Sequence, residues 1–321
     1  MHATKKKPTL KYKPRIKSKN KSYPIKDSAL YNLTTKKRLE NILKKPTSEL
    51  ISLANDANYR VFFHKRLDGK KREIQAPTIG LDIIQTRIAS LLVRIAIPDY
   101  VHSGVKGKSN ISNAKIHAGD HPVLTIDIKN FYPSISRKSI FHFFKNTMND
   151  APDVADMLAG LCTYQDHIPT GSRISMLLSF WANHKMYSSL HALCESQEVT
   201  MSIYVDDMTF SGRSVNRLFQ RKVEKIVSNA GLEVHPEKTR LYKRYQPKLV
   251  TGVIIDGETF KVRNKHHKNI YTLVNEIKSA KSDASLKSLQ KSLFGSLHAA
   301  GQIDPIFKQR AKAFLAHKNQ T

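Results

Sequence analysis

Apolar residues recur at two spacings along the chain, one typical of helices and the other of strands. Apolar positions three and four apart predict helices at residues 30–57, 81–95, 134–148, after Ser175, and at 215–229, 270–277 and 286–297. Pro46 divides the first range into two short helices, and Ser134 or Ser136 caps the third. Pro98 is expected to end the helix at 81–95, and Gly231 the helix at 215–229. Alternation predicts strands in both halves of 59–77, at 123–128, in both halves of 199–210, at 232–235 and at 249–256. Glycine and serine interrupt residues 101–122, which we expect to form a loop.

The stretch TMSIYVDDMTFSG, residues 200–212, has the alternation of a β-hairpin. Its apolar phase breaks at Asp206 and Asp207, which we expect to form a two-residue turn. The partners expected across this turn are Val205 with Met208, Tyr204 with Thr209 and Ile203 with Phe210. Tight hairpins favour Asn-Gly or Asp-Gly, and adjacent aspartates repel each other, so this turn is locally poor. A divalent cation would offset the repulsion.

A further acidic residue lies on the predicted strand VLTIDI. Leu124 and Ile126 share one face of this strand, so Asp127 points to the other face. If this strand and the hairpin belong to one sheet, Asp127, Asp206 and Asp207 converge. Such a cluster could bind two Mg²⁺ ions, which would clamp the attacking and leaving oxygens of a phosphoryl transfer. Taken alone, Y-x-D-D is a weak signal that an exposed acidic turn would also produce.

The chain is strongly basic, with 54 Lys and Arg residues against 26 Asp and Glu and a formal net charge of +28. This balance favours binding to polyanions, and to nucleic acid before an acidic membrane surface. Residues 1–26 contain 10 Lys and Arg residues, no acid and too few apolar residues to fold alone. This segment is either a solvated tail or an arm that becomes ordered on nucleic acid.

Several classes of protein are disfavoured. No apolar run approaches the roughly 18 residues of a membrane span, and the N-terminus lacks the apolar core of a signal peptide. We therefore expect a cytoplasmic protein with no membrane partner. Cys162 and Cys194 form no C-x-x-C pair and no H-E-x-x-H occurs, so neither disulfides nor zinc is indicated.

Sequence blocks in a characteristic order make the chain resemble a reverse transcriptase over about residues 30–260. The blocks are DGKKREIQAP, DIKNFYPSI, PTG, YVDD, GLEVHPEKT and VTG. Two features favour the bacterial retron reverse transcriptases within this family. They are N-A-x-x-H, present as Asn113, Ala114 and His117, and V-T-G, present as Val250, Thr251 and Gly252.

The resemblance implies roles for individual residues. Asp127, Asp206 and Asp207 would be the catalytic carboxylates that bind the metal ions, Lys65 and Arg72 would contact the incoming triphosphate, Tyr132 would abut the sugar and exclude a 2′-hydroxyl, and Lys238 would protonate the pyrophosphate leaving group. A guanidinium suits phosphate geometry, which supports Arg72. For Lys65 and Lys238, a solvated surface lysine is an equally good interpretation.

One block departs from the family pattern. Reverse transcriptases typically have Q-G-x-P-x-S-P where this chain has TGSRISM, so Thr170 replaces the glutamine while Gly171 and Ser175 are retained. In the family this loop helps to place template and nucleotide, a role that would fall here to Thr170 and Gly171. The replacement implies either weakened activity or another residue that supplies the contact.

The resemblance also implies an α+β fold with right-hand polymerase architecture. The expected parts are a basic N-terminal arm at residues 1–27, fingers at 28–120, a palm at 121–258 with a fingers insertion near 150–170, and a helical thumb at 259–321. The palm would be an antiparallel sheet with helices on one face.

The implied activity is RNA-directed DNA synthesis from deoxynucleoside triphosphates (dNTPs) with two Mg²⁺ ions. A retron enzyme would copy part of a structured noncoding RNA, prime from a 2′-hydroxyl and make a branched RNA–DNA product (msDNA) that serves in antiphage defence. A retron effector protein is a further partner that the resemblance leaves open. Two alternatives remain: another bacterial reverse transcriptase of the abortive-infection or group II intron type, and a nucleic-acid-binding scaffold with a weak or inactive polymerase fold.

Overall fold

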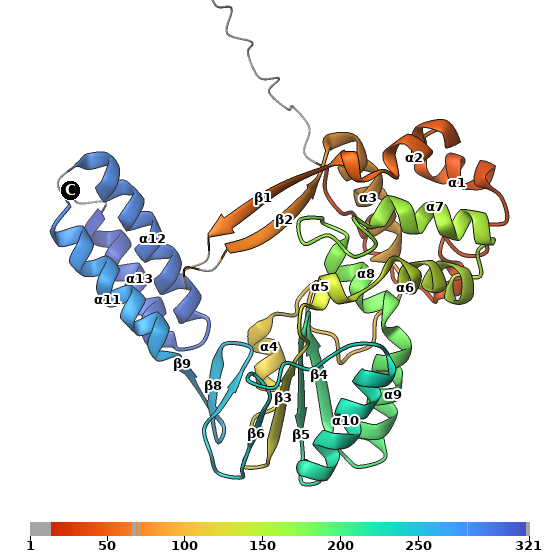
Figure 1. The fold of residues 1–321 in the computed structure, drawn as a ribbon. Coiled ribbons are helices and arrows are strands. Elements are labelled where there is room, and N and C mark those ends of the chain that lie inside the picture. The colour runs from red at the N-terminus through yellow and green to blue at the C-terminus, as the bar shows by residue number, and fades with distance from the viewer. Residues whose placement is uncertain (1–13, 66–68, 70, 281, 319–321) are drawn as a thin grey trace, which may run out of the picture. The chain divides into compact units, whose positions relative to one another are not determined.

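The computed structural model describes residues 14–65, 69, 71–280 and 282–318, and it combines helices with antiparallel sheets (Figure 1). This confirms the α+β class. Contacts divide the chain into two compact units, one formed by residues 1–98 and 129–185 and the other by residues 99–128 and 186–321. Residues 1–13 of the predicted basic arm and Asp68 of the predicted basic turn lie outside the described residues.

Helices form most of the first unit. They are α1 (Lys36–Leu43), α2 (Thr47–Leu53), α3 (Ile79–Leu92), α5 (Phe131–Ser134), α6 (Arg137–His142), α7 (Pro152–Cys162) and α8 (Ser175–Ala182), with a π-helical turn η3 (Phe143–Thr147) and 3₁₀ turns η1 (Ile25–Asp27) and η2 (Asp56–Asn58). The predicted pair of helices around Pro46 is confirmed. The single helix expected at 134–148 is instead α5, α6 and η3, and Ser136 caps α6 by accepting a hydrogen bond from the Ser139 amide.

Helix α3 ends at Leu92, before the Pro98 that we expected to stop it. The reason is a competing set of backbone hydrogen bonds. The Tyr23 amide donates to the Arg94 carbonyl, and the Ala96 amide donates to the Tyr23 carbonyl. Residues 94–96 therefore bond to a distant segment in place of extending the helix.

The predicted basic hairpin is present in the first unit. Strands β1 (Tyr59–Lys65) and β2 (Lys71–Pro77) pair antiparallel over their full length, from Tyr59 opposite Pro77 to Lys65 opposite Lys71. The end nearest the turn is exposed, whereas the base of the hairpin is buried.

A buried carboxyl anchors the segment before α1. Asp150 is 4% exposed, and its Oδ1 accepts a hydrogen bond from the Leu33 amide at 2.8 Å. Within the described part of the chain, its buried Oδ2 has no hydrogen-bond partner. Burial raises the pKa of Asp150 to about 7, although the hydrogen bond from Leu33 opposes this shift.

The second unit is built on a four-stranded antiparallel sheet in the order β4-β5-β3-β6. Its strands are β3 (Val123–Asp127), β4 (Thr200–Tyr204), β5 (Asp207–Ser211) and β6 (Arg240–Tyr242). One face is apolar and carries Leu124 beside Phe210. Helix α10 (Arg217–Asn229) packs on this face, where the Phe219 and Phe210 ring centroids lie 5.6 Å apart (Figure 1).

The hairpin formed by β4 and β5 differs from the prediction by one residue. Tyr204 pairs with Asp207 and Ile203 with Met208, so the turn residues are Val205 and Asp206. The predicted turn at Asp206-Asp207 and its register are therefore wrong. The observed register aligns Met208 with the buried Ile203, at the expense of a left-handed Val205 with φ of 61°. A β-branched residue strongly disfavours this conformation, so packing outweighs turn propensity here.

Three further predictions in the second unit are corrected. Part of the expected loop at 101–122 is α4 (Asn110–Lys115), closed by a capping box between Ser109 and Ser112. The strand expected at 232–235 is reduced to a single bridge at Val234. The strand expected at 249–256 is a hairpin of β7 (Lys248–Val250) and β8 (Val253–Asp256), extended by β9 (Thr259–Val262). Its turn is Thr251-Gly252, where both residues have positive φ.

The described residues of the C-terminal region form three helices, not the two predicted. Helices α11 (Asn264–Lys278), α12 (Asp283–Gly301) and α13 (Pro305–Lys318) lie side by side around a core that includes Leu293, Leu297 and Phe307 (Figure 1). Helix α9 (His184–Glu195) accounts for the rest of the helical pattern after Ser175. None of the helices in the described part of the chain combines the length and apolar character that crossing a membrane requires.

We expect Asp150 to make folding stability depend on pH. A carboxyl with a raised pKa binds its proton more tightly in the folded state, so its contribution is present below about pH 4 and is lost as pH rises through about 7. Asp150→Asn keeps the acceptor for Leu33 and removes the ionisation. Between pH 5 and 8 the variant should therefore gain up to about 3 kcal/mol relative to wild type in chemical denaturation. A stability difference that stays constant over this range would contradict the assignment.

Candidate active site

Two carboxylates face each other across adjacent strands of the second unit. Asp127 ends β3, Asp207 begins β5, and the two residues are direct antiparallel partners. Residues opposite each other in such a pair share one face of the sheet, with Cβ atoms about 5 Å apart. Both lie on the polar face, because Leu124 and Phe210 occupy the other one. Asp127 and the hairpin therefore belong to one sheet, which is the condition for their carboxylates to converge.

Asp206 occupies the turn beside this pair. Its backbone carbonyl accepts a hydrogen bond from the Ile128 amide at 3.2 Å, which ties the turn to the end of β3. Among the described residues, no set of three or more His, Cys, Asp or Glu side chains lies in an arrangement that could hold a metal ion.

Lys238 contacts the carboxylate pair from the segment after α10. Its Nζ donates to Asp127 Oδ1 at 2.8 Å, although the lysine side chain remains 57% exposed. The same segment holds the backbone of Asp127, whose carbonyl accepts from the His235 amide at 2.7 Å. The G-L-E-V-H-P-E-K-T block thus positions an ammonium group against the buried aspartate.

Burial and like charge both perturb the pKa of Asp207. Burial, followed by the nearby Asp206 and Asp127 carboxylates, raises the pKa of Asp207 to about 7, while Lys238 opposes the shift. The residues thus supply hard oxygen donors and an excess of negative charge, which is the chemistry that a divalent cation such as Mg²⁺ requires. Although no group of three such side chains forms among the described residues, Mg²⁺ usually takes one or two carboxylates and completes its shell with water and substrate phosphates, so the Asp127–Asp207 pair fits such an ion.

The carboxylates open into a cavity of about 460 Å³ within the second unit. Its lining comprises Asp127, Asp207, the cations Lys238, Arg240 and Arg263, Glu237, the hydroxyl-bearing Thr125, Thr209, Tyr204, Tyr242 and Thr251, and Ile126, Leu249 and Gly252. A pair of carboxylates beside three cations suits a phosphate chain whose reacting group lies at the carboxylates.

The two motifs that favour a retron enzyme contact each other behind this site. Asn113 Nδ2 donates to Thr251 Oγ1 at 3.4 Å, and Thr251 Oγ1 donates to the Asn110 carbonyl at 2.7 Å. The N-A-x-x-H segment is therefore fastened to the V-T-G turn, which contributes Thr251 and Gly252 to the cavity lining.

His117 joins the same segment to the hairpin that carries the aspartates. Its two ring nitrogens lie 2.7 Å from Ser211 Oγ and 2.7 Å from Ser202 Oγ, and the residue is fully buried. Burial, together with His121 and His102, lowers the pKa of His117 to about 3. The ring is therefore neutral and braces β4 against β5 on the polar face of the sheet.

The remaining candidate residues belong to the first unit. Thr170 lies against β2, where its amide and hydroxyl both donate to Gln75 Oε1 at 2.8 Å. Gly171 follows at a close approach of two backbones, since a Cβ at this position would lie 2.5 Å from the Gln75 carbonyl oxygen. The TGSRISM loop is therefore fixed to the hairpin, with Gln75 as its anchor.

Lys65, Arg72 and Tyr132 also lie in the first unit. Lys65 and Arg72 are exposed on β1 and β2, on opposite faces of the hairpin, since Arg72 pairs with His64 and Lys65 with Lys71. Tyr132 is half-buried in α5 next to Phe131. The structure thus brings together Asp127, Asp207 and Lys238 in one unit, and Thr170 and Gly171 against β2 in the other.

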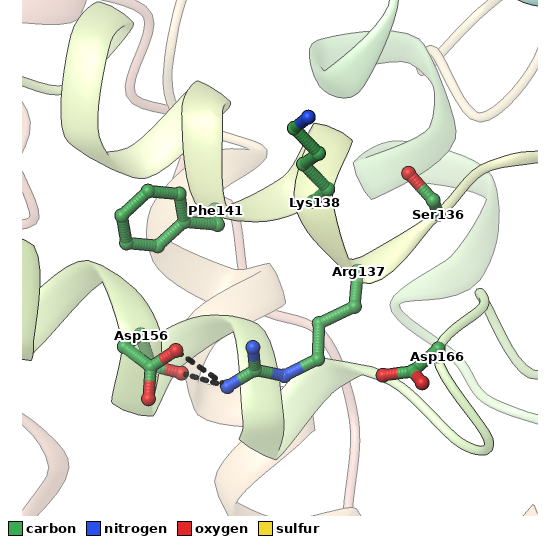
Figure 2. Close-up of a pocket in the computed structure, with 6 residues that line it drawn as sticks. All are labelled: Ser136, Arg137, Lys138, Phe141, Asp156 and Asp166. Atoms are coloured by element: carbon green, nitrogen blue, oxygen red, sulfur yellow. Dashed lines mark hydrogen bonds and ion pairs between the residues drawn. The ribbon is translucent and has the colours of Figure 1, made fainter.

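Figure 2 shows another cavity, of about 420 Å³, inside the first unit. It is lined by Ser136, Arg137, Lys138, Phe141, Asp156 and Asp166. Arg137 donates to Asp156 Oδ1 at 2.6 Å and to the Asp156 carbonyl, which ties α6 to α7. Its guanidinium is neutralised by that pair, so we interpret this cavity as a structural junction.

Comparison with known proteins agrees with the geometry. Residues 63–273 match the family model described as reverse transcriptase (RNA-dependent DNA polymerase). The chain belongs to the reverse transcriptase family. Among curated relatives, it is 33% identical over 218 residues to the Retron Se72 reverse transcriptase of Salmonella heidelberg, which covers 64% of this chain and 56% of the relative. The chain therefore spans just over half of that relative's length.

Two further relatives match more of their own length. Retron Ec48 reverse transcriptase of Escherichia coli is 21% identical over 309 residues, covering 90% of this chain and 75% of the relative. Retron Ec86 reverse transcriptase of Escherichia coli is 23% identical over 241 residues, covering 74% and 75% respectively. These matches confirm the resemblance to retron reverse transcriptases.

Three residues of this reverse transcriptase escaped the sequence interpretation. Arg240 and Arg263 line the carboxylate cavity, and Gln75 anchors the Thr170 loop. Arg240 lies on β6, a strand that the periodicity did not reveal because it is only three residues long. Gln75 belongs to the quoted DGKKREIQAP block, so that block was the available signal for it.

We expect His117→Ala to destabilise the second unit by about 3 kcal/mol, because it removes a buried ring and leaves the Ser202 and Ser211 hydroxyls without their shared partner. The triple variant His117→Leu, Ser202→Ala, Ser211→Ala removes all three polar groups and should recover part of the loss. Urea denaturation measures both. If the free energy of unfolding of His117→Ala lies within about 0.5 kcal/mol of the wild-type value, His117 does not brace the two strands.

Proposed function

We propose that this chain is an RNA-directed DNA polymerase of a retron, which copies part of a structured RNA into DNA. The observation that carries the proposal is the Asp127–Asp207 pair across β3 and β5, with Lys238 bound to Asp127 inside a cavity lined by cations. The relatives support the retron assignment, since all three are retron reverse transcriptases.

Two Mg²⁺ ions would be held by Asp127, Asp207 and Asp206. When bound, they supply the charge that activates a primer hydroxyl and stabilises the leaving pyrophosphate. The raised pKa of Asp207 supports this role: burial and then the neighbouring Asp206 and Asp127 carboxylates disfavour its negative charge, which a bound cation would stabilise. The other groups of the cavity would hold the substrate: Arg240 and Arg263 can donate to phosphate oxygens.

Lys238 would act as a proton donor to the leaving pyrophosphate. Its Nζ carries the proton at a position fixed by Asp127, and its 57% exposed side chain leaves room to turn toward a substrate. Lys65 and Arg72 would contact the triphosphate of the incoming nucleotide, and the exposed positions of both residues on β1 and β2 support this. Thr170 and Gly171 would help to place the template, with Gln75 supplying the amide that the loop lacks.

The same proposal divides the chain into the parts of a right-hand polymerase. The arm at 1–27, the fingers at 28–120 with an insertion near 150–170, the palm at 121–258 and the helical thumb at 259–321 would be the parts of a right-hand polymerase. The three-helix bundle of α11, α12 and α13 supports the thumb assignment. The sheet with Asp127 and Asp207 supports the palm, although α4 adds a helix to the unit beyond those expected on one face.

The partners would be a structured noncoding RNA, its DNA product and dNTPs, with priming from an RNA 2′-hydroxyl. The net charge of +28 supports a polyanionic partner. The alternative of a catalytically weak scaffold rests on Thr170, which replaces a family glutamine. It predicts that RNA is bound but not copied.

We expect Asp127→Asn and Asp206→Asn each to abolish DNA synthesis. Each change preserves the shape of the side chain while removing a charge and a strong oxygen ligand for Mg²⁺. RNA affinity should change little, because the cations that bind phosphate are intact. The measurement is primer extension on an RNA template with Mg²⁺, beside RNA binding and thermal melting. Wild type that extends no primer on its own copurified RNA would favour the scaffold.

We further expect Tyr132 to exclude ribonucleotides. An aromatic ring beside the sugar would collide with a 2′-hydroxyl, so Tyr132→Ala should incorporate ribonucleotides that wild type rejects, whereas Tyr132→Phe should discriminate like wild type. The incorporation ratio of ribonucleotides to deoxynucleotides measures this. Unchanged discrimination in a folded, active Tyr132→Ala variant means that the ring only packs against Phe131.

A further inference from the structure

Helix α10 presents a row of cations to solvent. Arg217, Arg221, Lys222 and Lys225 are all exposed. Within residues 14–65, 69, 71–280 and 282–318, no ion pair joins any of these four cations to a carboxylate. The acid within the helix, Glu224, instead accepts a hydrogen bond from Gln220 at 2.7 Å.

The buried side of α10 fixes where these cations point. Phe219, Val223 and Val227 form the stripe that packs on the sheet. Because successive residues turn by about 100°, Arg221 and Lys225 lie about 160° from Val223, directly away from the sheet. Arg217, Arg221 and Lys225 follow one another at intervals of about 6 Å along the axis. The cations therefore form a row that is inclined to the helix axis by about 40° of rotation per step, on a helix that is fixed to the sheet.

This arrangement is unfavourable for the isolated helix. Like charges four residues apart destabilise a helix by roughly 0.2–0.5 kcal/mol per pair. Arg217 with Arg221, and Arg221 with Lys225, are two such pairs. Solubility does not require them in a chain whose net charge is already +28. A bound polyanion would remove the cost.

The row is separate from the catalytic cavity. Asp207 and Phe210 lie on opposite faces of β5, and α10 covers the face of Phe210. A nucleic acid segment that reaches the carboxylates therefore lies on the other side of the sheet from α10. The cations of α10 would therefore contact a different segment of the nucleic acid from the one that reaches the carboxylates.

We propose that α10 binds the phosphate backbone of a double-stranded segment of the structured RNA, outside the catalytic cavity. This rests on the proposed function for the identity of the RNA. A duplex is favoured over a single strand because the aromatic residue of α10, Phe219, is buried and cannot stack on bases. Duplex RNA is recognised through regularly spaced phosphates and shape, which a rigid row of Arg and Lys matches.

The test compares wild type with the triple variant Arg217→Gln, Arg221→Gln, Lys225→Gln. One probe is an RNA template tail joined to a stem-loop, and the other is the same tail without the stem-loop, annealed to a DNA primer. The variant should bind the stem-loop RNA roughly tenfold or more weakly, with a log–log salt slope reduced by about three units. Its affinity for the tail and its extension of the short primer should be unchanged.

Two control variants make the outcome decisive. Arg217→Lys with Arg221→Lys keeps the charge and should bind the stem-loop RNA nearly as wild type does. Lys291→Gln, Lys308→Gln, Lys312→Gln removes three exposed charges from α12 and α13 and should spare stem-loop binding. Equal losses in both triple variants would show a bulk charge effect and overturn the proposal.

Two other results separate the α10 surface from the polymerase function. Unchanged stem-loop affinity in the α10 variant, shown folded by thermal melting, overturns the proposal and leaves the row for an acidic protein or for solvent. If wild type extends no primer but stem-loop binding still depends on α10, the polymerase function fails while the α10 surface stands. The two failures are therefore distinguishable.

Discussion

The direct pairing of Asp127 with Asp207 across β3 and β5 is the constraint on which the second unit depends. Like charges opposite each other are among the unfavourable cross-strand pairs, and partial burial strengthens their repulsion. Nearby groups act against this cost. Lys238 neutralises Asp127, and the raised pKa of Asp207 favours the uncharged form of that carboxyl. The sheet holds the two carboxylates in an arrangement that divalent cations from solution would stabilise.

Two neutral contacts support the strands that carry these carboxylates. His117 links Ser202 on β4 to Ser211 on β5 through a neutral buried ring. The His235 amide binds the Asp127 carbonyl, which holds the end of β3. Neither contact adds charge to the polar face. Rigidity comes from short, neutral hydrogen bonds, so the electrostatics of the cavity remain set by the carboxylates and the three cations.

The sequence was sufficient for the elements with long periodic patterns and for the carboxylate pair. Alternation located strands β3, β4 and β5 and the face on which Asp127 lies, because buried strands enforce a period of two. It misplaced the hairpin turn, because a left-handed Val205 contradicts turn propensity and is imposed only by packing. Helix α4 was missed because Ser112, not Glu or Gln, completes its capping box. The turn depends on a tertiary contact that no local pattern encodes, whereas the signal for α4 is local but uses an unusual residue.

The sheet order also has a consequence for synthesis of the chain. β3 is translated first but lies inside the sheet, between β5 and β6. At about 5–20 residues per second, its partners reach the solvent on the order of several seconds later, after the ribosome has made residues 129–185 of the first unit. During this interval an apolar strand has two open edges, which is a state prone to aggregation. A chain that stops before Arg240 would keep one of these edges open permanently, so premature termination should yield insoluble product and not a smaller folded domain.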